Sequence, residues 1–321
     1  MDLDLEGRYQ RERVTTSYQL VPQTTSAFKS FIPRVILTYK PTDEMTTYAS
    51  WARGSLPGTD NSIVPLLSPA LQATVQAAPG YTVAVPAETV QNFELGVKQQ
   101  SARFRYALTG YFMKWNNLKN RVSYACPGNQ CGPTVVNATV NVTLAQTAKI
   151  YGVEAEVGAV LTDAWDVNAS FDYVHGRYDR FFQPLTIQHT GQSNAAGKTI
   201  LGFPEAQAAV TTTYRGTFSN PDWSWYTRAG MTYSGKIYVE EVNQSWIAGS
   251  ARVNLHAGIE HGQSKIDFYV DNLTDNRQWI GGLRALQSNY TVGTVVASQA
   301  TATMVLPRLR TFGVRISTKF N

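Results

Sequence analysis

The sequence is poor in the residues that mark a soluble enzyme. Only 16% of its 321 residues are charged, against about a quarter in ordinary globular proteins. Its 4 histidines and 2 cysteines show no metal-ligand spacing, so we expect no metal site and no cofactor. No stretch approaches the roughly 18 consecutive apolar residues of a membrane-spanning helix. The Lys and Arg residues are scattered, with a net charge of +5, which argues against a nucleic-acid partner.

A secretory signal is also missing. The chain begins with acidic residues, and no apolar segment of the signal-peptide type follows. Taken with the features below, this predicts that the N-terminus of the natural protein lies elsewhere.

The sequence is rich in alternation with a period of two, whereas helical periodicity is nearly absent. At 265–271, for example, Ile266, Phe268 and Val270 alternate with charged and aromatic residues. We predict about twelve strands of roughly the ten-residue length that crosses a membrane. Their approximate spans are 3–20, 28–40, 45–56, 88–100, 102–122, 141–160, 165–181, 204–216, 223–238, 249–262, 264–275 and 305–320.

The connections between these strands alternate in length. Short turns rich in Asp, Asn, Pro and Gly lie near 41–44, 99–103 and 162–166, whereas the links 56–87, 123–141 and 275–304 are long. Short turns at one end and long loops at the other are typical of an outer-membrane β-barrel. Aromatic residues gather near both ends of the segments, as expected for interfacial girdles. The predicted fold is therefore all-β, an antiparallel up-and-down transmembrane barrel.

Several segments resemble one family, the TonB-dependent outer-membrane receptors. The segment 31–58 (FIPRVILTYKPTDEMTTYASWARGSLPG) resembles its strand–turn–strand pattern, and 86–122 begins with a PET-like segment before an ELG-x-K strand. The segment 150–178 resembles the family's GVE-x-E and LTD patterns. The closing segments 270–279 (VDNLTDNRQW) and 307–320 (PRLRTFGVRISTKF) resemble its C-terminal motifs. Each pattern is weak alone, but together they run in family order over nearly the whole chain.

This resemblance implies a particular function and set of partners. Barrels of the family have 22 strands and a plugged lumen, so residues 1–321 correspond to the C-terminal part of such a barrel, without its plug domain. The full protein would import a ferric siderophore or a similar nutrient chelate across the bacterial outer membrane. Its partners would be outer-membrane lipid, the plug domain, TonB and the barrel assembly machinery. No enzyme activity is implied, and Phe320 would end the strand that this machinery recognises.

Three sets of candidate site residues follow. Cys126 and Cys131, in a predicted external loop, are expected to form a disulfide in an oxidising compartment. Cationic and aromatic residues in the long loops and upper lumen suit an anionic, ring-bearing chelate: Arg53, Tyr124, Arg177, Tyr178, Arg180, His189, Trp246, Arg284 and Tyr290. Alternation predicts a lumen-facing set: Glu154, Glu156, Arg252, Asp267, Asp271, Arg315 and Lys319.

Other chemistries fit the residues less well. Glu154 and Glu156 share a strand face, but a lumen-facing position explains paired carboxylates better than acid–base catalysis. The GQSNAAGKT segment at 191–199 has the wrong glycine spacing for a phosphate-binding loop. Two further functions stay open: about twelve strands closing into a small independent pore, and a soluble β-rich binding module. The pore would conduct in planar bilayers, and the module would fold without detergent.

Overall fold

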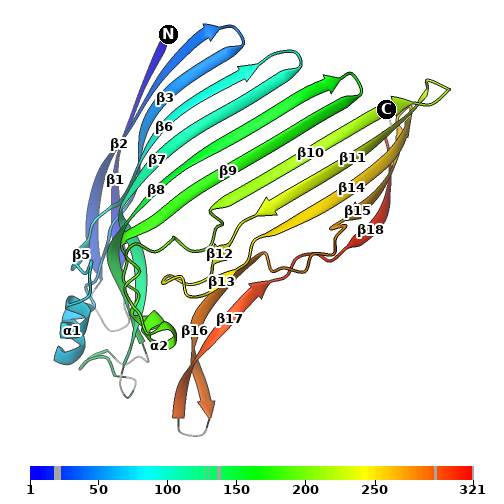
Figure 1. The fold of residues 1–321 in the computed structure, drawn as a ribbon. Helices are drawn as coiled ribbons and strands as arrows, with labels where there is room; N and C mark the ends of the chain where they lie inside the picture. Colours follow the sequence, from blue (N-terminus) through cyan, green and yellow to red (C-terminus); the bar gives the residue numbers. More distant parts are fainter. Residues whose placement is uncertain (18–22, 127, 129, 136–138, 293–294, 320–321) are drawn as a thin grey trace.

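Among the described residues, twelve long strands form one antiparallel sheet in the computed structural model of the chain (Figure 1). The structure describes residues 1–17, 23–126, 128, 130–135, 139–292 and 295–319. Each sheet strand pairs with the next one along the chain, so the sheet is an up-and-down meander with β1 and β18 at its edges. The strands are β1 (Asp2–Thr16), β2 (Thr24–Thr42), β3 (Met45–Leu56), β6 (Glu88–Gln100), β7 (Phe104–Ala125), β8 (Thr139–Thr162), β9 (Trp165–Arg180), β10 (Ala206–Thr217), β11 (Trp223–Ser234), β14 (Ser250–His261), β15 (Ser264–Asp271) and β18 (Thr311–Thr318).

The predicted antiparallel fold and its twelve segments are confirmed. The expected bounds of β3 and β6 are those observed. β15 ends earlier than predicted, because Asn272 has a φ of 53° and turns the chain out of the strand. The Asn272 side chain fixes this turn by donating to the carbonyl oxygens of Asn276 and Arg308 at 2.9 and 3.0 Å. β18 begins later than predicted, at Thr311.

The long connections contain further elements, which gather at the end of the sheet opposite the tight turns (Figure 1). They are β4 (Thr59–Asp60), η1 (Val64–Leu66), α1 (Pro69–Gln76), β5 (Ala84–Val85), η3 (Pro184–Thr186), α2 (Ile187–Thr190), β12 (Ile237–Tyr238), β13 (Trp246–Ile247), β16 (Gly281–Val292) and β17 (Val295–Val305). The β16–β17 hairpin extends beyond the sheet (Figure 1). No helix in the described part of the chain has the length and apolar content to cross a bilayer.

The two faces of the sheet differ in chemistry, as period-two alternation requires. One face, called here the apolar face, carries large hydrophobic side chains that are openly exposed: Leu95 is 69% exposed and Phe268 51%. The opposite polar face carries Asp267, which pairs in register with Arg315 and is only 6% exposed. A soluble sheet would cover a face like the apolar one, so this surface requires an apolar environment.

The long-loop end has its own packed core. Ile63, Val64 and Val75 from the 57–87 connection pack against Val142 and Leu144 of β8, and all five side chains are at most 2% exposed. This packing covers the polar face of β7 and β8, because Leu144 and Val142 alternate with outward-facing residues of β8. The loops therefore fold onto the polar face near the end of the sheet.

Side-chain and backbone hydrogen bonds fasten the 57–87 connection to β8. The Ala145 amide donates to the Gly80 carbonyl at 2.8 Å, and Gln146 Nε2 donates to the Pro79 carbonyl at 3.0 Å. The Asn61 side chain donates to the carbonyl oxygens of Thr82 and Thr143, each at 2.8 Å, and accepts from the Thr143 backbone amide at 2.9 Å. Asn61 is 1% exposed. The Asn61 side chain pairs with the backbone of Thr143 as a neighbouring strand would. Both its oxygen and its nitrogen therefore have hydrogen-bond partners within the core.

Candidate functional site

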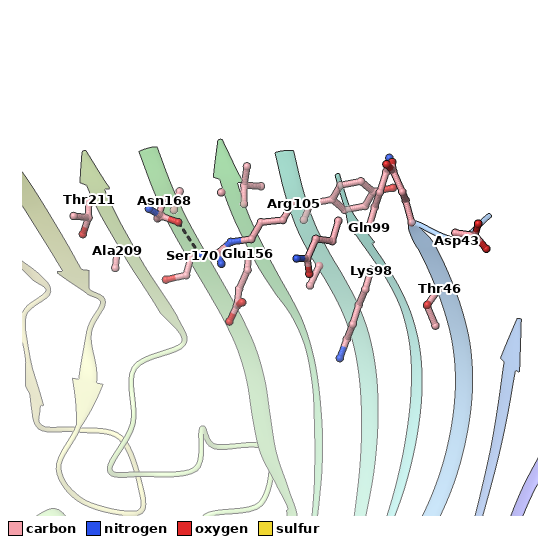
Figure 2. Close-up of a pocket in the computed structure, with 17 residues that line it drawn as sticks. Asp43, Thr46, Lys98, Gln99, Arg105, Glu156, Asn168, Ser170, Ala209 and Thr211 are labelled. Atoms are coloured by element: carbon pink, nitrogen blue, oxygen red, sulfur yellow. Dashed lines mark hydrogen bonds between the residues drawn. The ribbon is translucent and has the colours of Figure 1, made fainter. Parts of the chain in front are cut away.

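A polar hollow of about 720 Å³ lies on the polar face near the tight turns (Figure 2). Lys98 of β6, Glu156 of β8 and Ser170 of β9 line it, and the strand register places them in one row. Asp43 lies at the rim of the hollow, in the turn between β2 and β3. This mixture of charges at one depth suits a polar protein surface better than an apolar ligand.

Arg105 crosses β8 to reach Asn168 on β9. Its Nη2 donates to Asn168 Oδ1 at 2.8 Å (Figure 2). This path is open because Gly158 lies between them, where an added Cβ would stand 2.5 Å from Arg105 Nε. Gly158 is thus needed for the close approach of a neighbouring side chain. Alternation identifies these positions as polar-facing, but it does not reveal the contact across an intervening strand.

A second polar cluster surrounds Asp267. The Tyr226 hydroxyl donates to one carboxylate oxygen of Asp267, and His256 Nδ1 lies 3.2 Å from the other. Lys265 Nζ lies 4.1 Å from the centre of the Tyr226 ring. Within the described residues no cluster of His, Cys, Asp and Glu is arranged to hold a metal ion. The cluster satisfies the polar groups of three strands and holds their side chains in place.

The predicted lumen-facing residues occupy the polar face where the register defines it. Glu154 and Glu156 lie opposite Asp172 and Ser170, and Asp271 lies opposite Thr311. Arg252 donates to the Gln278 carbonyl at 3.3 Å. Lys319 follows the last residue of β18, and its backbone amide donates to the Gln263 carbonyl at 3.2 Å. Phe320 lies outside the described residues.

At the long-loop end, Glu240 organises a compact platform. This residue is fully buried. Its carboxylate accepts from the backbone amide of Gln244, from that of Val242 at 2.8 Å and from that of Ser245 at 2.9 Å. Arg284 of β16 donates to Ser245 Oγ at 2.7 Å and to the His189 carbonyl at 3.2 Å. We name the group formed by His189, residues 240–246 and Arg284 the loop platform.

The loop platform contains titratable groups in a partly dry setting. Both ring nitrogens of His189 are buried without a hydrogen-bond partner. Burial and the nearby Arg284 guanidinium lower the pKa of His189, while Glu240 opposes them. Burial raises the pKa of the Glu241 carboxyl. Trp246 is 57% exposed, and Lys236 Nζ lies 5.7 Å from the centre of its ring, so this region presents an aromatic surface to solvent beside the Lys236 cation.

The other predicted ligand residues are dispersed. Tyr124 and Tyr178 are 9% and 4% exposed and pack within the loop-end cores, because the loops fold onto the strand ends that carry them. Arg180 is exposed and donates to the Ala145 carbonyl at 3.0 Å. Arg53 and Arg177 lie on the apolar-face side of their strands. Tyr290 pairs with Ala297 in β16, and its side chain lies outside the described residues.

The structure joins Cys126 and Cys131 in a disulfide. Both belong to the loop-end core, and they are 6% and 0% exposed. The Cys131 carbonyl accepts from the Ser68 backbone amide at 2.7 Å. The bridge therefore ties the end of β7 to the connection that contains α1.

A meander with one openly exposed apolar face, one polar face and long loops at one end is the wall of a transmembrane β-barrel. The chain belongs to the TonB-dependent receptor family, because residues 1–273 match the family described as "TonB dependent receptor-like, beta-barrel". This confirms the resemblance seen in the sequence. The homologues in this family are barrel proteins of the outer membrane, and they are receptors and transporters.

Individual relatives agree. The chain is 24% identical over 256 residues to the "Probable TonB-dependent siderophore receptor PiuA" of Acinetobacter baumannii, covering 79% of this chain and 31% of that protein. The structure of BauA, the ferric preacinetobactin receptor of A. baumannii, matches with a TM-score of 0.66 and 18% identity, over 99% of this chain and 40% of that one. The ferric yersiniabactin receptor FyuA of Yersinia pestis gives a TM-score of 0.63 and 17% identity, over 99% and 42%. The chain thus spans less than half the length of these relatives.

Proposed function

We propose that residues 1–321 form the C-terminal part of the barrel of an outer-membrane receptor that imports a ferric siderophore or a similar nutrient chelate. The observation that carries this is the family match over residues 1–273, joined to a sheet with one apolar and one polar face. The relatives named above are siderophore receptors, which supports iron chelates as the cargo class.

We infer a role for each region from its position in the sheet. The apolar face contacts lipid, and the polar face lines the lumen, where the row from Lys98 to Ser170 would contact a plug domain. As the family resemblance implies, coupling to TonB would pass through that plug. Transport would need binding and gated passage and no bond chemistry. The C-terminal strand would be read by the barrel assembly machinery.

Ligand capture would occur at the loop platform. Arg284 supplies one cation of the loop platform, and the exposed Trp246 ring lies 5.7 Å from Lys236 Nζ. Arg180 supplies a further cation at the end of β9. An anionic chelate with aromatic groups would gain charge pairing and stacking there. His189 lies beside Arg284 within the same platform.

The test is uptake of a radiolabelled ferric siderophore by a receptor-deficient strain that carries the complete gene for this chain. We expect uptake that requires TonB. Trp246→Ala and Arg284→Gln should weaken ligand binding several-fold. Trp223→Ala is the matched control, because Trp223 is 41% exposed but lies at the tight-turn end, stacked on His261.

Two results would contradict the proposal. Uptake that continues without TonB, with steady conductance in planar bilayers, would favour the independent pore. A chain that folds without detergent and remains in aqueous solution would favour the soluble binding module. The 321-residue chain expressed alone is expected to give no energised uptake, because the plug that would couple to TonB is absent from it.

A further inference from the structure

Three cations stand in a row across neighbouring strands on the apolar-face side. The register pairs Lys114 of β7 with Lys149 of β8, and Lys149 with Arg177 of β9. The row continues through Gln91 of β6 to Arg53 of β3. We name Lys114, Lys149 and Arg177 the cation row.

This alignment is unfavourable for the isolated chain. Residues directly opposite on antiparallel strands have Cβ atoms about 5 Å apart, and like charges in such positions destabilise the pair. Two carboxylates offset part of the cost: Asp179 lies 3.1 Å from Lys149, and Glu205 lies 2.7 Å from Arg177. Within the described part of the chain no ion pair joins Lys114 to a carboxylate. The row keeps an excess of positive charge.

The depth of the row is set by the side chains below it. Phe112, Tyr151 and His175 form the preceding row on the same face, with Tyr151 and His175 rings 4.7 Å apart. Below them, the apolar face runs from Phe112 down to Phe104 on β7, about 27 Å along the strand at about 3.4 Å per residue. With the usual strand tilt this is close to the thickness of the lipid-facing band of a barrel.

The cation row therefore begins where the apolar band ends, on the long-loop side. Interfacial aromatic rings mark the headgroup level. Because barrel strands are tilted, residues paired in one row lie at slightly different depths across this headgroup level. The arrangement recurs on β1 and β2, where Tyr9 pairs with Phe31 and the next pair on the same face is Arg11 with Lys29. Two sites with the same order argue against a chance alignment.

We propose that the cation row binds the phosphate groups of a phosphorylated lipid of the outer leaflet. Lysine and arginine form strong charge-assisted hydrogen bonds with phosphate oxygens, and these groups lie at the depth and on the face where such a headgroup would be. The bound phosphates would relieve the repulsion within the row. The proposal rests on the membrane placement in the proposed function and is independent of the cargo.

The experiment uses the complete receptor, purified from outer membranes in mild detergent, without siderophore. Native mass spectrometry and phosphorus analysis measure the lipid that remains bound. The test variant combines Lys114→Gln, Lys149→Gln and Arg177→Gln. The control combines Arg8→Gln, Arg34→Gln and Arg315→Gln, which remove the same charge from the polar face. Lys114→Arg with Lys149→Arg tests whether cations alone suffice.

We expect the test variant to lose bound phosphorylated lipid roughly tenfold or more, since several charge-assisted hydrogen bonds are removed together. The control and the Lys→Arg variant should keep it. Equal retention in the test variant, or equal loss in the control, would overturn the proposal. Displacement of all bound phosphorus by inorganic phosphate would do the same, because it would show an anion site without lipid.

Effects on assembly and on siderophore binding are measured separately from lipid binding. Should the triple variant fail to assemble into membranes, Lys114→Gln alone is measured, because this cation is held by no carboxylate. Loss of siderophore binding with lipid retained would count against the proposed cargo and leave the cation row intact. Lipid loss with normal siderophore binding would support the cation row without bearing on the cargo.

Discussion

The long-loop end and the sheet are built on opposite packing rules. At the loop end, side chains such as Leu144 and Val64 are fully buried in a core closed by a disulfide. In the sheet, side chains of the same type such as Leu95 and Ile316 are 69% and 74% exposed. The loop end excludes water by packing protein on protein, whereas the sheet depends on a surrounding apolar solvent. One chain thus combines a soluble-protein core with a membrane wall.

The sharpest test of this comparison is the same substitution in both regions. Leu144→Ala should destabilise the loop end by about 3–4 kcal/mol, because it leaves a cavity in a fully packed core. Leu95→Ala should cost less, about 2 kcal/mol in a bilayer, because the transfer of the side chain from water to lipid is lost but mobile lipid tails leave no cavity. Hydrogen exchange of residues 61–81 in reconstituted receptor checks the first change, and denaturant unfolding in vesicles checks both. Similar costs at the two sites would contradict the distinction.

An arginine introduced on one face of the sheet should affect stability differently from one introduced on the other face. Leu108→Arg, on the apolar face of β7, should destabilise the protein by about 3 kcal/mol in a bilayer, as an arginine near the midplane of a barrel does. Ala107→Arg is the matched control, because it is the next residue but lines the polar hollow. The measurement is urea unfolding in lipid vesicles. A large cost at Ala107 and none at Leu108 would reverse the assignment of the faces.

The smallest expected effect is a pH response confined to the loop end. His189 has a lowered pKa in the folded protein, so below its ordinary value near 6.5 the unfolded segment binds more protons than the folded one. The loop platform should therefore lose stability as the pH falls through about 6.5. Glu241 acts in the opposite direction, because its raised pKa favours the folded state when it gains a proton. Hydrogen exchange of residues 187–190 and 240–246 measures the combined effect of His189 and Glu241 on the stability of the loop platform.

Two variants separate the contributions of His189 and Glu241. His189→Gln should remove the loss of protection between pH 7 and 5, whereas Glu241→Gln should make that loss larger. Exchange in β14 should stay constant over this range. If His189→Gln retains the full pH response, the histidine is not its source.

The parts predictable from sequence were those that depend on alternation. Leu95 and Lys98, or Phe268 and Asp267, separate by parity alone, and the tight turns follow from their residue types. The family motifs added the resemblance to the TonB-dependent receptors. Period two reports which side a residue faces, but it carries no information on what covers that side.

That limit shows at particular residues. Tyr124 and Tyr178 look like exposed loop aromatics in the sequence, yet the connections containing α1 and α2 fold over them. Glu240 gave no sequence signal, because its role depends on three backbone amides in its own turn. The cation row was equally hidden: its members lie far apart along the chain, and only the strand register brings them together.

Under the proposed placement of the long loops outside the cell, the hydrogen bonds of Asn61 have a consequence for molecules that bind this surface. The Asn61 side-chain amide is bonded to two backbone segments, and the adjoining α1 packs on β8. The 57–87 connection therefore presents one defined surface conformation instead of a flexible peptide. An antibody or a bacteriophage that recognises this surface would have to match a shape assembled from several segments. A synthetic peptide copied from residues 57–87 would lack that shape.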